Sequence, residues 1–165
     1  MRKTTLTRTM KFLHVIGSIG FCGALLALIV LHASLPDPEA VAQFAALRMA
    51  MGNVAAWVLL PSTGLVVVSG LLAMAMNDRF KSAGWTWAKL ASGVLILEGT
   101  LVYVQAPMER AAGDALATLE GELDLSSLGA TLVSEWASFW VILGVAAVNI
   151  VLGVYRPRFS RRVEK

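Results

Sequence analysis

Four long apolar runs, separated by short polar stretches, dominate the pattern of hydrophobic and polar positions along the chain. The runs occupy residues 12–33, 49–77, 90–108 and 136–155. Each is close to the roughly 20 residues that an α-helix needs to cross the hydrocarbon of a bilayer. Lipid offers no partners to backbone N–H and C=O groups, and the runs lack the alternating pattern of barrel strands. The pattern therefore predicts an all-α polytopic membrane protein, a bundle of four transmembrane helices.

We expect one membrane domain over residues 1–165, with spans at about 12–33, 53–76, 86–106 and 132–155. Two connections, at about 38–51 and 108–124, also have helical apolar spacing and predict amphipathic helices at the outer surface. The second is either a lid over the bundle or a solvated surface helix. Asp37 is the expected N-cap of the first, with Pro38 in its first turn. Pro61 predicts a kink near Trp57 in the second span.

Composition and charge narrow the class of protein. Hydrophobic residues make up 57% of the chain, and the spans use most of it, which leaves no room for a separate soluble catalytic domain. Three segments beside the spans are basic: they carry Arg2, Lys3, Arg8, Lys11, Arg79, Lys81, Arg156, Arg158, Arg161, Arg162 and Lys165. The other two connections hold only Arg48 and Arg110 among several acids. The positive-inside rule therefore predicts cytoplasmic N- and C-termini in a bacterial inner membrane, and no nucleic acid as partner.

The basic start and the first apolar run resemble a secretory signal, but the run of 22 residues is longer than the roughly 7 to 15 of a signal. We expect an uncleaved first helix. Cys22, the only cysteine, lies inside it and excludes an intrachain disulfide or a cysteine-based metal cluster.

His14 is the first candidate for chemistry. It lies three residues after Lys11, hence only ~4.5 Å deeper along the helix axis, near the expected cytoplasmic boundary. An imidazole in a membrane span needs a hydrogen bond or a metal. Gly17, Ser18 and Phe21 share its face and leave room either for a flat cofactor or for a close neighbouring helix. The residues alone leave both interpretations open.

His32 shares the face of His14 but lies ~27 Å further along the helix, so one haem cannot bind both. We expect His32 at the outer interface. The chain has no third histidine. A haem would therefore need His14 alone, His14 with another ligand such as Met74 or Met76, or a second copy of the protein.

Lys89 opens the third span, and the direction of that span places it in the same leaflet as His14. Its ammonium either pairs with a haem propionate or an anionic substrate, or extends to the interface beside Trp85 and Trp87. Asn149 falls at a similar depth on the fourth span and is expected to hydrogen-bond across the bundle.

Glu98 lies nine residues after Lys89, a rotation of about 180° around the helix. Lys89 then shares its face with Gly93, Thr100 and Tyr103, and we expect that face to be interior. Glu98, near the centre of the hydrocarbon, is a candidate for a proton relay or an oligomer contact, or it makes only a hydrogen bond.

Several motifs carry a resemblance to known proteins. The start Lys-Phe-Leu-His-Val-Ile-Gly, the connection Pro-Asp-Pro-Glu, the second span Leu-Pro-Ser-Thr-Gly-Leu-Val-Val-Val-Ser-Gly and the opening Trp-Thr-Trp-Ala-Lys-Leu resemble a family of bacterial integral membrane proteins of unknown function. The likeness runs from about Lys11 to Arg110. More distantly, the first-span histidine and Trp-x-x-x-Lys-Leu at 85–90 are similar to HemJ-type protoporphyrinogen oxidases and copper-resistance CopD proteins.

The HemJ resemblance implies haem binding by His14 and a functional role for Lys89. Further histidines of that pattern are replaced here, with Trp87 inside the motif and Glu98 downstream, so haem binding is carried over without the oxidase activity. The CopD resemblance implies copper handling, for which Met49 and Met51 supply too few soft ligands.

We therefore expect a haem-b-binding, redox-linked membrane protein, with His14 as metal ligand and Lys89, Gly17 and Asn149 completing the cofactor site. The alternative is a non-enzymatic accessory or transport-associated subunit without cofactor. Besides the lipid bilayer, the expected partners are further copies of the chain or a partner membrane subunit. No residue is assigned as catalytic.

Overall fold

The computed structural model describes residues 2–76 and 84–155, and every regular element in these ranges is a helix. The elements in chain order are α1 (Arg2–Ala33), α2 (Val41–Val54), η1 (Ala55–Leu59), α3 (Leu60–Ala75), α5 (Gly84–Thr100), η2 (Leu101–Gln105), α6 (Ala106–Leu119), η3 (Leu125–Ser127) and α7 (Leu132–Tyr155). Within the described ranges four continuous helices are long and apolar enough to cross a membrane: Thr5–Ala33, Val41–Ala75, Gly84–Leu119 and Leu132–Tyr155. This confirms the predicted all-α bundle.

The two middle helices each contain one π-helical turn, and each turn comes just before a proline. In η1 the Leu60 N–H donates to Ala55 O, and in η2 the Ala106 N–H donates to Leu101 O. Pro61 and Pro107 follow. Because a proline has no N–H and its ring crowds the carbonyl four residues earlier, the helix widens there by one residue. Trp57, near which a kink was predicted, lies within η1.

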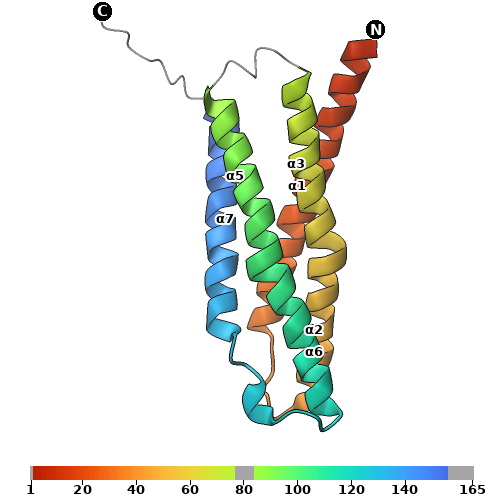
Figure 1. Ribbon diagram of the computed structural model, residues 1–165, viewed down its shortest axis with the longest axis vertical. Coiled ribbons are helices and arrows are strands. Elements are labelled where there is room, and N and C mark those ends of the chain that lie inside the picture. The colour runs from red at the N-terminus through yellow and green to blue at the C-terminus, as the bar shows by residue number, and fades with distance from the viewer. Residues whose placement is uncertain (1, 77–83, 156–165) are drawn as a thin grey trace, which may run out of the picture.

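The helices pack in pairs. α1 packs mainly on α3, α5 on α7, and α3 on α5, while the shorter α2 and α6 pack on each other. We call the end of the bundle with Thr5 and Tyr155 the terminal end, and the opposite end the loop end. Figure 1 shows α3 and α5 well apart at the terminal end and converging toward the loop end, where α2 and α6 lie.

Small residues let α1 approach α3 closely. A Cβ added at Gly17 would lie 3.0 Å from Val66 Cγ2 and 3.1 Å from Ser62 O, and one at Gly20 would collide with the Ser62 side chain. Without a hydrophobic force between helices in lipid, such close backbone contact is a main source of association. These glycines therefore fix the register of α1 on α3.

The main core lies away from the terminal end. Its largest fully buried members include Leu25, Leu28, Met51, Leu59 and Phe139. Many apolar side chains on the opposite faces are exposed, Trp57 and Val133 among them, as expected of surfaces that face lipid. The bundle is thus tightly packed at its middle and loop end.

The connections at the loop end have turn chemistry of their own. Asp37 Oδ1 accepts the Glu39 N–H in a local turn, so α2 begins at Val41 rather than at the predicted Pro38. At the end of α6, Gly121 has φ +81°, and the Glu122 N–H bonds to Ala117 O while the Gly121 N–H bonds to Thr118 O. This is a Schellman motif, which requires the left-handed conformation that glycine adopts freely.

Candidate functional site

His14 on α1 is held by α3. Its Nδ1 lies 3.0 Å from Val66 O and 3.1 Å from Ser69 Oγ. A carbonyl oxygen only accepts, so Nδ1 carries the proton, and the neutral ring keeps a lone pair on Nε2. No described residue hydrogen-bonds Nε2. An imidazole with Nδ1 fixed by a backbone carbonyl and Nε2 free is the usual arrangement of a metal-binding histidine.

The absence of a side chain at Gly70 makes room for this ring. A Cβ at Gly70 would lie 3.6 Å from His14 Cε1, so any longer side chain would push the imidazole off α3. Ser69 Oγ donates to Leu65 O at 2.6 Å and therefore offers His14 an oxygen lone pair as a second acceptor. The ring is thus anchored by the helix backbone.

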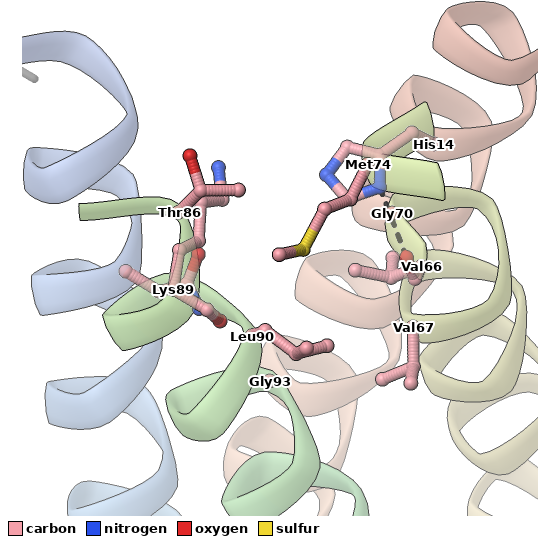
Figure 2. A pocket seen from close by; sticks show the side chains of 10 residues that line it. His14, Val66, Val67, Gly70, Met74, Thr86, Lys89, Leu90 and Gly93 are labelled. Carbon is pink, nitrogen blue, oxygen red and sulfur yellow. Dashed lines mark hydrogen bonds between the residues drawn. The ribbon is translucent and has the colours of Figure 1, made fainter. Parts of the chain in front are cut away.

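A pocket lies between the two helix pairs. His14, Val66, Val67, Gly70 and Met74 line one side, and Thr86, Lys89, Leu90, Gly93 and Asn149 line the other. Figure 2 shows His14 and Met74 facing Thr86 and Lys89 across the pocket, with the His14–Val66 hydrogen bond on the α3 side. The void measures about 90 Å³. A second void of about 100 Å³ shares His14, Lys89 and Asn149 and extends to Cys22 and Ile96.

Lys89 and Asn149 are positioned by contacts between α5 and α7. Asn149 Nδ2 donates to Lys89 O at 3.1 Å and to Ser92 Oγ at 2.7 Å. The Lys89 ammonium lies beside Gly153, where an added Cβ would be 2.7 Å from Nζ. Asn149 thus fixes the backbone at Lys89, and the glycine leaves space for the ammonium.

Three of the four residues predicted to bind a cofactor therefore line one pocket. His14, Lys89 and Asn149 meet there, whereas Gly17 lies outside the lining and packs against α3. Thr86, which the sequence did not single out, also lines it. Its Oγ1 is buried without a hydrogen-bond partner in the described part of the chain, and a hydroxyl left this way favours a ligand that completes it.

The donor chemistry of the pocket fits a haem, but its volume holds only part of one. His14 Nε2 would bind iron, Lys89 supplies a cation for a propionate, and Met74, one of the two methionines predicted as second ligand, also lines the void. A cavity of roughly 150 Å³ accommodates benzene. Voids of about 90 and 100 Å³ are smaller than that, so a porphyrin requires α3 and α5 to separate. Among the described residues, no three His, Cys, Asp or Glu side chains form a metal cluster.

A second polar group, at the loop end, was missed by the sequence analysis. Arg48 on α2 and Glu135 on α7 are each 1% exposed, and Arg48 Nη1 donates to Glu135 Oε2 at 2.7 Å. Thr131 Oγ1 donates to Glu135 Oε1 at 2.6 Å. His32 Nε2 lies 3.1 Å from Oε2 but out of line for a hydrogen bond. His32 is buried in this group at the loop end, and its place at the outer side of the membrane stays a prediction.

Aromatic rings enclose the group. Trp136 stacks on the His32 ring at 4.9 Å between centroids, Phe139 meets it edge-on at 5.5 Å, and the Arg48 guanidinium lies 5.3 Å from the Phe44 ring centroid. The charges are therefore shielded from water, where their mutual attraction is stronger than at a surface. The group joins α1, α2 and α7. The sign of this group in the sequence was Arg48, an isolated arginine in an otherwise acidic connection.

Glu98 lies on the opposite face of α5 from the pocket. Glu98, Leu95 and Val102 are all exposed, which confirms that Lys89 and Glu98 occupy different faces. The prediction that Tyr103 shares the interior face of Lys89 is wrong, because Tyr103 is 61% exposed, while Thr100 is buried. The roles predicted for the exposed Glu98 side chain, an oligomer contact, a proton relay or only a hydrogen bond, stay predictions.

Comparison of the chain with protein-family models, with curated proteins and with solved structures finds no match. The likeness to the family of unknown function, and the more distant likeness to HemJ-type and CopD proteins, therefore stay predictions from the motifs.

Proposed function

We propose that the protein is a redox-linked integral membrane protein that binds haem b at His14, on the cytoplasmic side of a bacterial inner membrane. The observation that supports this most is the state of the His14 ring. Its Nδ1 is bound to Val66 O on α3, and its Nε2 has no described partner beside a pocket lined by Lys89. A helix-packing histidine needs only the first of these features.

In this proposal each lining group has a separate task. His14 binds the metal, the Lys89 ammonium compensates a propionate charge, and the orphaned Thr86 hydroxyl gains a hydrogen-bond partner. Asn149 is a positioning residue, because it acts through the backbone of Lys89. When bound, the haem would supply one-electron transfer.

Binding requires the helix pairs to move apart at the terminal end. α3 and α5 are already separate there (Figure 1), whereas α2, α6 and the main core hold the loop end together. An opening of this kind leaves the contacts at the loop end in place, but it displaces Phe21, Ile96 and Ala146, members of the main core that line the second void. His14 and Lys89, which line the pocket on opposite sides, would then hold the haem.

A second candidate function is a cofactor-free accessory subunit. The small size of the voids favours it, together with the fact that the His14 Nδ1 and the Asn149 amide are fully explained as contacts between helices. In this reading the polar residues only specify helix packing. The two candidates differ in one measurable property, the visible spectrum.

The test is an absorption spectrum of detergent-purified protein from cells supplied with haem. We expect a Soret band in the wild type that His14→Ala removes and that Val15→Ala, a matched change on the lipid-exposed side of the same helix, retains. Lys89→Met should lower the haem content or shift the midpoint potential, and Lys89→Arg should be intermediate. A wild type without a band, oxidised and reduced, would leave the accessory-subunit function.

A further inference from the structure

We infer that the loop end of the bundle contains a second binding site, for a small monocarboxylate about the size of benzoate, with Arg48 as its anchor. The site is a cavity of about 250 Å³ bounded by α2, α6 and the segment that leads into α7. It is separate from the His14 pocket, with which it shares no lining residue. The inference does not depend on haem binding.

The first observation is an unsatisfied buried donor on a residue that lines this cavity. Arg48 lines the cavity and is 1% exposed; its Nη1 is used by Glu135, yet its Nε is buried without a hydrogen-bond partner in the described residues. A buried N–H of a charged group left unpaired is costly, and native proteins rarely retain one without a role. Because Nε itself is covered, a ligand acceptor in the cavity would complete it once the Arg48 side chain turns toward the cavity.

The second observation is the charge around the cavity. Arg110 and Asp114, both exposed, also line it, and Glu135 already neutralises one edge of Arg48. A guanidinium binds a planar carboxylate better than it binds other acceptors, because its donors match both oxygens. The Asp114 carboxylate repels any anion, and repels a more highly charged one more strongly. The arrangement therefore disfavours a ligand with more than one negative charge.

The third observation is size and lining. A cavity of about 250 Å³ exceeds the roughly 150 Å³ that accommodates benzene. Phe44, Pro107 and Leu128 provide apolar walls, while Thr131 and Ser134 provide hydroxyls. An apolar body with one carboxylate fits this combination. The exposed rim gives access from the aqueous side of the loop end.

The test uses benzoate as probe and benzyl alcohol as its uncharged match, titrated calorimetrically into the full chain in lipid nanodiscs. We expect saturable binding of benzoate and binding of benzyl alcohol at least about tenfold weaker. Arg48→Lys keeps the charge opposite Glu135 but removes the Nε donor, and should weaken benzoate by a similar factor. Arg8→Lys, outside the cavity, should leave binding unchanged.

A second variant tests the site if Arg48→Lys does not fold. Ala130 is exposed and lines the cavity without belonging to the ion pair, so Ala130→Trp fills the space and should abolish benzoate binding. Absence of saturable benzoate binding by the wild type would overturn the site. So would equal binding of benzoate and benzyl alcohol, or wild-type affinity in Ala130→Trp.

Discussion

Arg48 and Glu135 are 87 positions apart in the chain and meet at 2.7 Å inside the bundle, both almost fully buried. The pair closes the loop end, because one partner lies on α2 and the other in the first turn of α7. Removing one partner of a buried ion pair strongly destabilises the fold, because the other charge is left buried without compensation. Replacing both partners by apolar residues has little effect on stability. This asymmetry gives a direct test.

We predict that Arg48→Met alone lowers the free energy of unfolding by about 3–5 kcal/mol, since it leaves the Glu135 carboxylate buried beside only Thr131 and His32. Glu135→Leu alone should have a similar effect. The double variant should recover most of the loss. The measurement is a double-mutant cycle by SDS titration with circular dichroism in micelles. Additive losses in the double variant would show that the two residues do not stabilise each other.

The next prediction concerns Gly17, which we expect to act in the close packing of α1 on α3. Gly17→Ala places a methyl 3.1 Å from Ser62 O and Val66 N, which are backbone atoms that cannot turn away, so α1 must shift on α3. We expect a loss of about 1–3 kcal/mol in unfolding free energy. Gly23→Ala is the matched control, because nothing lies within 4 Å of its added Cβ. Equal stability of the two variants would contradict the packing role.

The depth of a residue along its helix was predictable from the sequence. The face of the helix on which a residue lies was predictable only as far as the π-helical turns. His14, Lys89 and Asn149 were placed at one level from their positions near the ends of their spans and from the direction of each span, and they line one pocket. Thr100 and Tyr103 were assigned to one face with the constant rotation of an α-helix. The π turn η2 begins at Leu101 and changes that rotation, so Thr100 is buried and Tyr103 is exposed.

The Arg48–Glu135 pair could not be predicted from the sequence, for a related reason. Each residue sits beside an apolar run, where a charge also serves to set topology or to mark a helix end, and neither function requires a partner. Their meeting depends on how α2 and α7 pack around α1, which is a property of the tertiary structure. The same holds for Thr86, whose unsatisfied hydroxyl is visible only once the helices are assembled.

The remaining prediction concerns orientation, and it decides which compartment each cavity faces. Ser34 and Gly121 lie at the loop end, and the basic segments adjoin, in the sequence, the helix ends that make up the terminal end. The positive-inside rule therefore predicts periplasmic activity of reporters fused at Ser34 and Gly121, and cytoplasmic activity of a reporter at the C-terminus. In that orientation His14 meets cytoplasmic ligands and Arg48 meets periplasmic ones. Cytoplasmic activity at both loop-end fusions would show that the bundle has the opposite orientation. His14 would then face the periplasmic side, and the Arg48 cavity the cytoplasmic side.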